Sequence, residues 1–199
     1  MKNSALLVVD VQRDFCPGGK LAVAGGDEIV PLINRIARDY PHVVLTQDWH
    51  PANHSSFVSQ HKGATPFSQI KMPYGVQTLW PDHCVVGSVG AGFHQDLDLP
   101  QAELVLRKGF RRAIDSYSAF FENDRNTPTG LGGYLRERGF THITCVGLAF
   151  DFCVRYSAED ARKLGFEVEV IEAATRAIDL DGSAEDTKKS FVAHGIRLS

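Results

Sequence analysis

The stretch "CVGLAFDFCVRYSAEDARKLG" (residues 145–165) joins an apolar run to a polar run that is rich in Ala and charged residues. The apolar half is typical of a strand that is buried on both faces, and the polar half is typical of an amphipathic helix that ends at Gly165. Cys153 stands where the two halves meet. Most free cysteines serve as small core hydrophobes, so this junction alone leaves the role of the Cys153 thiol open.

The same alternation of apolar runs and helical patterns recurs along the chain and predicts an α/β fold. The runs rich in Val, Ile and Leu predict six strands, most of them parallel. These strands are expected at 5–11, 42–49, 103–109, 142–149, 167–174 and 195–199. Helical spacing of Ile29, Ile33, Ile36 and Tyr40 predicts a first helix, and helix start and stop signals predict two later ones, at 127–139 and 183–195.

The chain of 199 residues has the size of one domain, and we expect a single domain over residues 1–199. Two connections, 50–102 and 110–126, are long for a compact α/β fold. Both contain aromatic residues, which disordered segments usually lack. We therefore expect these connections to be ordered and functional, with 50–102 forming a metal and substrate loop region.

The formal charge of −3 produces no strong field of either sign, so we expect neither nucleic acid nor a membrane surface as a partner. The sequence contains neither an apolar run long enough to span a membrane nor the pattern of a signal peptide. Its four cysteines are few and irregularly spaced, which favours reduced thiols over a disulfide framework. These features predict a cytoplasmic protein.

Ionisable or nucleophilic residues follow four consecutive predicted strands. They are Asp10, Asp48 with His50, Lys108 and Cys153. Each alone is more often a turn former, a solvated strand end or a packing residue than a catalyst. In a parallel sheet, however, the carboxyl ends of the strands form one edge, which is where ligands bind. The convergence of these residues on that edge therefore predicts a functional site.

The position of Cys153 adds to this argument. If a helix begins near Asp151 or Phe152, the thiol lies in the first turn, where free backbone N–H groups and the helix dipole favour a thiolate. Cys145, in contrast, lies inside an apolar strand and is interpreted as a core residue. We therefore expect Cys153 to react at a lower pH than an ordinary thiol.

A second group of residues has the composition of a metal site. The segment "DWHPANH" contains Asp48, His50 and His54, and "WPDHC" adds His83. One carboxylate with two or three imidazoles is a common ligand set for zinc, iron or manganese. On spacing alone, hydrogen-bonded loop residues explain these side chains equally well, so both interpretations stay open at this point.

Five segments together resemble the nicotinamidase/pyrazinamidase group of the isochorismatase-like cysteine hydrolases. They are "VVDVQRDFCPGGKLAVAGG" (8–26), "TQDWHPANHSSF" (46–57), "WPDHCVVGSVGAGFH" (80–94), "RKGFRRAIDSYSAFFEN" (107–123) and "VGLAFDFCVRYSAEDA" (146–161). The match runs nearly end to end and follows the order of the group. The resemblance implies the isochorismatase-like hydrolase fold, a three-layer α/β/α structure around a six-stranded, mostly parallel sheet.

The resemblance also implies roles for individual residues. Asp10, Lys108 and Cys153 would form the catalytic triad, and the amides of Ala149 and Cys153 would form the oxyanion hole. A cis peptide bond between Leu148 and Ala149 is expected as well.

For the metal, the resemblance implies one divalent transition metal, zinc or iron with manganese as a further candidate. Its ligands would be Asp48, His50 and His83. His54 is a variable fourth ligand within the group.

The resemblance further implies that Phe15, Trp80 and Tyr117 line a pocket for the ring of the substrate. The activity would be the hydrolysis of nicotinamide to nicotinic acid and ammonia through a Cys thioester in NAD salvage, and of pyrazinamide to pyrazinoic acid. Two alternatives remain: another hydrolase of the family that acts on a different small amide, and a non-catalytic protein that binds a small molecule or metal on this fold. The partners expected are small molecules, and a homo-oligomer is left open.

Overall fold

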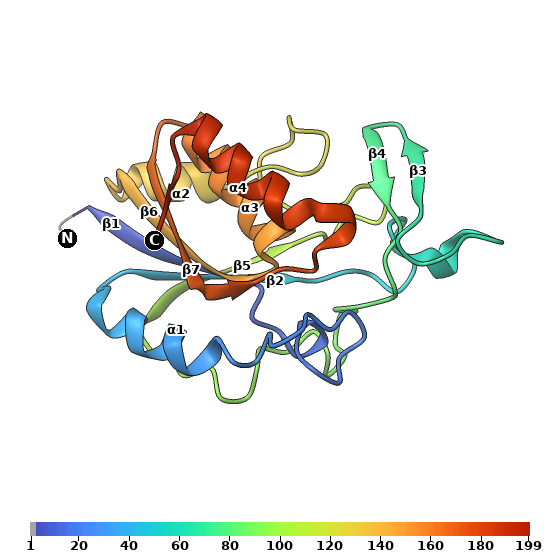
Figure 1. Ribbon diagram of the computed structural model, residues 1–199, viewed down its shortest axis with the longest axis horizontal. Coiled ribbons are helices and arrows are strands. Elements are labelled where there is room, and N and C mark those ends of the chain that lie inside the picture. The colour runs from blue at the N-terminus through green and yellow to red at the C-terminus, as the bar shows by residue number, and fades with distance from the viewer. Residues whose placement is uncertain (1–2) are drawn as a thin grey trace.

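The computed structural model describes residues 3–199, whose centre is a six-stranded sheet (Figure 1). The strand order is β5-β2-β1-β6-β7-β8, and every neighbouring pair is parallel. The strands are β1 (Ser4–Val9), β2 (Val43–Asp48), β5 (Ala102–Lys108), β6 (His142–Leu148), β7 (Glu167–Arg176) and β8 (Arg197–Leu198). The six predicted strands are therefore confirmed, and each strand begins and ends within two residues of the expected position.

Both faces of this sheet are covered, which explains why its strands are continuous apolar runs. Successive residues of β1 point to opposite faces: Leu6 and Val8 pack into one core, and Leu7 and Val9 into the other. Helix α1 (Val30–Ile36) covers the first face. Helices α2 (Leu131–Glu137), α3 (Arg155–Lys163) and α4 (Ser183–His194) cover the second (Figure 1). The three-layer α/β/α architecture is confirmed.

The strand order reverses around β1. From β1 the chain moves outward through β2 to β5, then returns to the other side of β1 and continues through β6, β7 and β8. In open α/β sheets, the crevice at such a reversal, outside the carboxyl ends of the strands, is the usual ligand site. The reversal therefore brings the residues that follow β1, β2, β5 and β6 to one place.

The helix predicted at 127–139 begins later than expected. Residues before α2 extend back along an earlier part of the loop: Thr129 N–H donates to the Phe120 carbonyl (3.0 Å), and Phe121 and Pro128 form an antiparallel bridge. These hydrogen bonds occupy backbone N–H and carbonyl groups that a helix beginning at Thr127 would need. The helix expected at 183–195 is confirmed as α4, which Gly195 ends in a left-handed conformation.

The long connection after β2 contains structure that the sequence did not reveal. Strands β3 (Gln69–Met72) and β4 (Gly75–Thr78) form an antiparallel hairpin on the carboxyl-end side of the sheet (Figure 1). Five single-turn helical segments complete the fold: η1 (Arg13–Phe15), η2 (Ala37–Asp39), η3 (Val58–Gln60), the π-type η4 (Phe150–Val154) and η5 (Leu180–Gly182). Within residues 3–199, no helix has the length and apolarity needed to cross a membrane.

The tightest backbone contact of the sheet predicts a stability difference between two glycines. At Gly147, in β6, a Cβ atom would lie 2.1 Å from the Val9 carbonyl oxygen, and φ is +112°. Gly147→Ala should therefore lower the free energy of unfolding by about 2 to 4 kcal/mol, as measured by urea denaturation. The matched control is Gly133→Ala in α2, where a Cβ meets no atom within 4 Å.

Gly133→Ala should raise the free energy of unfolding by about 0.5 to 1 kcal/mol, because alanine favours the helix. Equal free energies of unfolding for the two variants would contradict the close approach of β1 and β6.

Candidate active site

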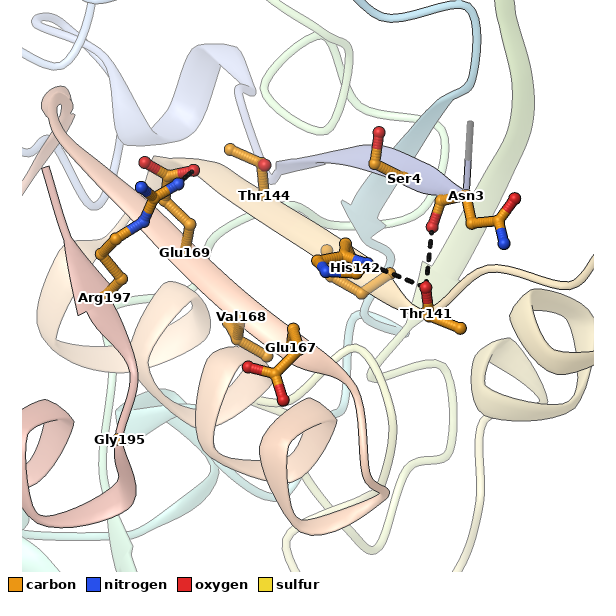
Figure 2. Close-up of a pocket in the computed structure, with 11 residues that line it drawn as sticks. Asn3, Ser4, Thr141, His142, Thr144, Glu167, Val168, Glu169, Gly195 and Arg197 are labelled. Atoms are coloured by element: carbon orange, nitrogen blue, oxygen red, sulfur yellow. Dashed lines mark hydrogen bonds and ion pairs between the residues drawn. The ribbon is translucent and has the colours of Figure 1, made fainter. Parts of the chain in front are cut away.

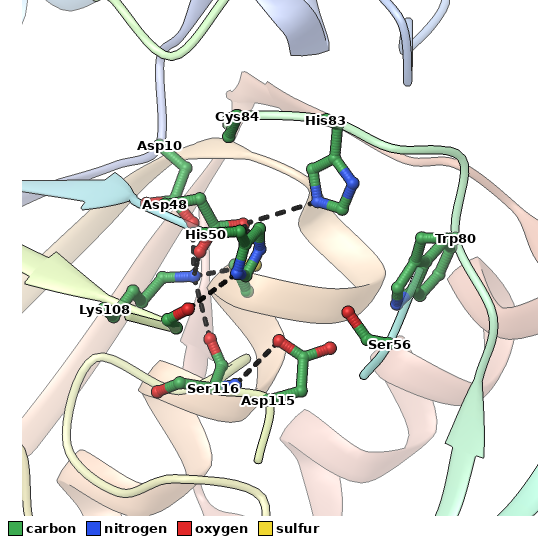
Figure 3. A network of polar contacts seen from close by, with 12 residues as sticks. Asp10, Asp48, His50, Ser56, Trp80, His83, Cys84, Lys108, Asp115 and Ser116 are labelled. Carbon is green, nitrogen blue, oxygen red and sulfur yellow. Dashed lines mark hydrogen bonds and ion pairs between the residues drawn. The ribbon is translucent and has the colours of Figure 1, made fainter. Parts of the chain in front are cut away.

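A buried ammonium group organises the site at the carboxyl edge of the sheet (Figure 3). Lys108 ends β5, and its Nζ lies 2.8 Å from Asp10 Oδ2 and 3.4 Å from Cys153 Sγ. It also contacts Asp48 Oδ1 and donates to the Ser116 carbonyl at 2.9 Å. The structure thus brings together the three residues predicted as a triad, with the ammonium group between the carboxylates and the thiol.

Asp10 is held directly after β1 by a reciprocal contact with β2. Its backbone N–H donates to Thr46 Oγ1 (3.1 Å), and the Thr46 hydroxyl donates back to Asp10 Oδ1 (2.6 Å). Asp10 has φ of +46°, a conformation that non-glycine residues adopt rarely and mostly at functional sites. This arrangement aims the carboxylate at Lys108 and brings it within 4.8 Å of the Cys153 thiol.

Cys153 lies in the π-turn η4 that connects β6 to α3. The N–H groups of Phe152 and Val154 both donate to the Ala149 carbonyl at 3.1 Å. The Leu148–Ala149 peptide bond is cis, as expected. Cys145, also as expected, is a fully buried core residue. The two cysteines of the opening stretch therefore have different surroundings, one apolar and one charged.

The turn around Cys153 is fastened by a residue that sequence reasoning passed over. The buried Asp151 carboxylate accepts hydrogen bonds from Ile178 N–H (3.0 Å), Asp179 N–H (2.7 Å) and Ser183 Oγ (2.5 Å). Carboxylates that accept several backbone N–H groups make strong, specific contacts. Asp151 therefore ties the loop after β7 to the turn that carries Cys153, and it brings Ile178 to the substrate pocket. Its position two residues before Cys153 is the signal that could have pointed to it.

The expectation that Cys153 has a lowered pKa is wrong for this site. Burial raises the pKa of the thiol well above its ordinary value; Lys108 opposes this shift, while the carboxylates of Asp10 and Asp48 reinforce it. The dipole of a single helical turn does not outweigh these charges. This shift of the pKa favours the protonated thiol, and the Asp10 carboxylate lies within 4.8 Å of it.

The two carboxylates near Lys108 differ in their protonation behaviour. Burial and the charge of Asp48 raise the pKa of Asp10 despite the opposing effect of Lys108. For Asp48, burial also acts to raise the pKa, but Lys108 and His50 hold it well below its usual range. Environments that push the pKa values of two neighbouring acids apart are the usual basis for dividing their roles. Here Asp10 is suited to take a proton and Asp48 to stay ionised.

Asp48, His50 and His83 form a cluster whose ligand atoms all lie within 4.8 Å of one another. His50 Nε2 and His83 Nε2 lie 3.5 and 3.8 Å from Asp48 Oδ2 (Figure 3). Each Nδ1 donates to a backbone carbonyl, His50 to Gly109 (2.8 Å) and His83 to Pro81 (2.7 Å). Such outer hydrogen bonds fix the tautomer that leaves Nε2 free to bind a metal.

The charges around this cluster also fit a divalent cation. Asp10, Asp48 and Asp115 are buried carboxylates, whereas Lys108 is the buried cation that contacts two of them. Buried charges are normally paired or bound to metal, because an uncompensated charge in the interior costs several kcal/mol. One carboxylate and two imidazoles with free Nε2 atoms are the donor set that zinc and iron prefer.

His54 lies beside the cluster rather than in it. Its ring packs against that of His50 in a tilted arrangement, with centroids 4.4 Å apart. Its Nε2 donates to the Ile114 carbonyl (3.2 Å), and its Nδ1 is bonded to Ser56 (Oγ at 2.7 Å). With His50 and Asp115 it makes a separate group of potential ligands. The structure therefore brings together three of the four predicted ligands and engages both ring nitrogens of the fourth elsewhere.

A small cavity of about 20 Å³ opens beside Cys153 and the histidine cluster. Its lining includes Phe15, Trp80 and Tyr117, the three residues predicted to surround a substrate ring, and Ala149 of the predicted oxyanion hole. The other lining residues are Leu21, Asp48, His83, Asp115, Phe152, Cys153 and Ile178. Phe152, Ile178 and Asp115 were not predicted. Phe152 is a neighbour of Cys153, but Ile178 and Asp115 carry no signal that separates them from other loop residues.

Two further residues that were not predicted hold the loops of the site. Gln12 Nε2 donates to the carbonyls of Asp48 and Ala91 (both 2.9 Å), and its Oε1 accepts from Asp48 N–H (2.8 Å). Asp14 Oδ2 accepts from Cys84 N–H at 2.7 Å, next to His83. Both lie in the "VQRDF" segment (residues 11–15) that directly follows Asp10.

A cavity of about 670 Å³ lies at the opposite end of the sheet (Figure 2). It is lined by residues at the amino ends of β1, β6 and β7 and on β8, among them His142, Glu167 and Arg197. Arg197 is paired with Glu169 at 2.5 Å. Cys153 and the histidine cluster are at the other edge of the sheet, so this larger space is separate from the candidate active site.

A parallel α/β sheet that gathers a thiol, a carboxylate and an ammonium group at its carboxyl edge is the arrangement of a cysteine hydrolase. Residues 4–196 match the Isochorismatase domain family, so the chain belongs to that family. A nicotinamidase from Acinetobacter baylyi is 54% identical over 98% of this chain and 91% of its own length. The resemblance to the nicotinamidase/pyrazinamidase group is therefore confirmed.

Solved structures agree with this assignment. A nicotinamidase/pyrazinamidase from Acinetobacter baumanii superposes with a TM-score of 0.99 at 53% identity, covering 100% of this chain and 96% of that one. A structure from L. infantum in complex with nicotinate has a TM-score of 0.87 at 39% identity, with coverage of 100% and 92%. A pyrazinamidase from Pyrococcus horikoshii in complex with zinc has a TM-score of 0.80 at 34% identity, with coverage of 99% and 98%.

The raised pKa of Cys153 predicts how its thiol titrates. In metal-free protein, the thiolate absorbance that distinguishes the native chain from Cys153→Ser should be absent at pH 8. It should emerge only above the range of an ordinary thiol, whose pKa is about 8.5. The raised pKa means that the proton is held to higher pH. A thiolate signal that is complete below about pH 7 would instead show that Lys108 and the helix turn dominate.

Proposed function

We propose that this protein hydrolyses nicotinamide to nicotinic acid and ammonia, and pyrazinamide to pyrazinoic acid, as one catalytic domain over residues 1–199. The proposal rests above all on the contact of Lys108 with Asp10 and Cys153, next to an aromatic cavity and the Asp48, His50 and His83 cluster. The nicotinamidase from Acinetobacter baylyi and the nicotinate complex from L. infantum support this choice of substrate. Release of nicotinic acid for NAD salvage in the cytoplasm is the corresponding role.

The first half of the reaction forms a bond to sulfur. Asp10 accepts the thiol proton of Cys153 as Sγ attacks the carboxamide carbon, so that a neutral thiol becomes a nucleophile at the moment of reaction. Lys108 stays protonated throughout, because Asp10 and Asp48 raise its pKa well above the usual value although burial acts in the opposite direction. Its charge stabilises the carboxylate before proton transfer and the thiolate during it.

The second half of the reaction releases ammonia and then the acid. The N–H groups of Ala149 and Cys153 stabilise the tetrahedral oxyanion, a contribution of about 3 kcal/mol for each donor. Asp10 returns its proton to the amine nitrogen as the C–N bond breaks, which leaves a thioester on Cys153. Water, deprotonated by Asp10, then attacks the thioester carbonyl, and nicotinic acid departs as the thiol is restored.

Asp48, His50 and His83 would hold one divalent metal, zinc or iron, and His54 would lie beside it with both ring nitrogens hydrogen-bonded to the protein. The zinc complex of the Pyrococcus horikoshii pyrazinamidase supports a metal at this cluster. When bound, the metal supplies a Lewis-acid site that can orient the ring nitrogen of the substrate. Phe15, Trp80 and Tyr117 pack against the ring and keep bulk water away from the reacting carbon.

The nucleophile is tested by a pair of cysteine variants. Cys153→Ala should lower ammonia release from nicotinamide by a factor on the order of 10⁴ or more, with the circular dichroism spectrum unchanged. Cys145→Ala is the matched control, because its thiol is buried in the apolar core. It should cost stability but keep turnover, and substantial turnover by Cys153→Ala would remove Cys153 as the nucleophile.

The wild-type protein distinguishes the two alternatives. Release of ammonia from another small amide, with none from nicotinamide, would indicate a different hydrolase of the family. Binding of nicotinamide without any turnover would indicate a non-catalytic protein.

The metal site is tested by elemental analysis of purified histidine variants. The native protein should contain metal in stoichiometric amount, and His50→Ala and His83→Ala should each lose most of it, because each removes one of three clustered donors. His61→Ala is the control, since His61 Nε2 donates to the Ser55 carbonyl (2.8 Å) away from the cluster. His54→Ala should retain metal. Unchanged metal content in His50→Ala and His83→Ala would contradict the site.

A further inference from the structure

The hairpin β3–β4 reaches the substrate cavity through one end of β4. Gln69, at the start of β3, is exposed, whereas Gln77, near the end of β4, is fully buried. A buried amide is stable only when its donors and acceptor are all bonded. The partners of Gln77 therefore show what the hairpin is attached to.

The amide nitrogen of Gln77 faces two residues that line the cavity. Its Nε2 lies 2.9 Å from Asp115 Oδ2, 2.9 Å from the Tyr117 hydroxyl and 2.7 Å from the Thr78 carbonyl. Asp115 Oδ1 accepts the Ser116 N–H (2.8 Å), so both carboxylate oxygens are bonded. Figure 3 shows Asp115 between the Lys108 cluster and Trp80. Gln77 thus supplies a hydrogen bond to a buried charge in the wall of the cavity.

The amide oxygen of Gln77 faces the hairpin and the following loop. Its Oε1 accepts from the Tyr74 hydroxyl (3.1 Å) and from Asn123 Nδ2 (3.2 Å). Asn123 Oδ1 in turn accepts the N–H of Tyr117 at 3.0 Å. Tyr117 is therefore held at both its backbone and its hydroxyl by groups that Gln77 bonds.

The aromatic wall that these bonds secure closes the cavity. The Tyr117 hydroxyl also accepts from Trp80 Nε1 (3.1 Å), and the rings of Trp80 and Phe152 pack edge to face with centroids 4.9 Å apart. Tyr156 stacks on Tyr117 from behind at 5.4 Å. The cavity of about 20 Å³ holds about one water molecule, so the position of this wall bears directly on the space left for a ring.

We propose that Gln77 is a positioning residue that fixes Tyr117, Trp80 and Asp115, and thereby sets the size of the ring that the cavity accepts. The inference rests on the proposed function, because the ring is that of the substrate. Gln77 does not touch the reacting atoms. It acts through the aromatic wall, so its loss should weaken substrate binding and ring selectivity much more than the chemical step.

The chemistry of the amide explains why another side chain of the same size would not serve. Leucine matches glutamine in volume but would remove one hydrogen bond each from Asp115 Oδ2, the Tyr117 hydroxyl and Asn123 Nδ2. Removing one partner of a hydrogen bond to a charged group is more damaging than removing both, because the remaining group is desolvated and unpaired. The wall would relax toward arrangements that solvate Asp115.

The test compares Gln77→Leu with Gln69→Leu, which makes the same change on the exposed strand of the same hairpin. For Gln77→Leu we expect KM for nicotinamide to rise about tenfold while kcat changes less than about threefold. The ratio of kcat/KM for nicotinamide over 5-methylnicotinamide should fall, because a loosened wall admits the additional methyl group. Gln69→Leu should match the native protein in all three quantities.

Trp80 fluorescence gives a second readout that does not depend on turnover. In a Trp49→Phe background Trp80 is the remaining tryptophan of the chain. Its emission should shift to longer wavelength in Gln77→Leu without ligand, since the Tyr117 contact is loosened. If wild-type protein does not act on nicotinamide, the proposed function fails, and this shift still decides whether Gln77 positions the wall.

Three results would overturn the inference. One is native KM, selectivity and emission in a folded Gln77→Leu. A second is lowered stability with unchanged KM and emission, which would make the role of Gln77 purely structural. If Gln77→Leu does not fold, Gln77→Asn takes its place, because the asparagine amide is set back by one methylene from Asp115 and Tyr117. Native KM, selectivity and emission in Gln77→Asn would be the third result.

Discussion

Two carboxylates and a thiol share one enclosed site in this protein because Lys108 places a positive charge among them. Asp10, Asp48 and Cys153 come from three different strand ends and all lie in contact with its ammonium group. Each carboxylate alone would be costly to bury. The same ion pairs therefore join the ends of β1, β2 and β5 and set the charge at the reacting sulfur, so the stability and the chemistry of this edge cannot be separated.

The two carboxylates that contact Lys108 have pKa values shifted in opposite directions, and this difference suits them to separate roles. Asp48 also faces His50, which helps to hold its pKa low, so it stays ionised as a donor for a cation. Asp10 has a raised pKa and lies within 4.8 Å of the thiol, which suits the proton transfer that we propose for it. A fold that brought only one of them to Lys108 would have a base or a metal ligand, but not both.

The pattern of the sequence was sufficient for the sheet and for the residues at its edge, because both follow from local features. Apolar runs identify buried strands, and the residue after such a run lies at the carboxyl edge in any parallel sheet. The same approach placed the start of the helix at Thr127 wrongly. There, the Thr129 N–H bonds to the Phe120 carbonyl, so the backbone before the helix pairs with an earlier segment of the chain. A capping signal read from the local sequence does not include such a contact.

The sequence by itself determined the α/β class, the order of the strands along the chain and the convergence of Asp10, Lys108 and Cys153. Only the tertiary structure decided the direction in which the pKa of Cys153 shifts, because burial and the carboxylates of distant strands act on the thiol through space. It likewise decided that Asp115 lines the cavity and that Gln77 donates to it. Polar residues of this kind acquire a role only from the side chains that folding brings beside them, and the periodicity of the sequence carries no information about that contact.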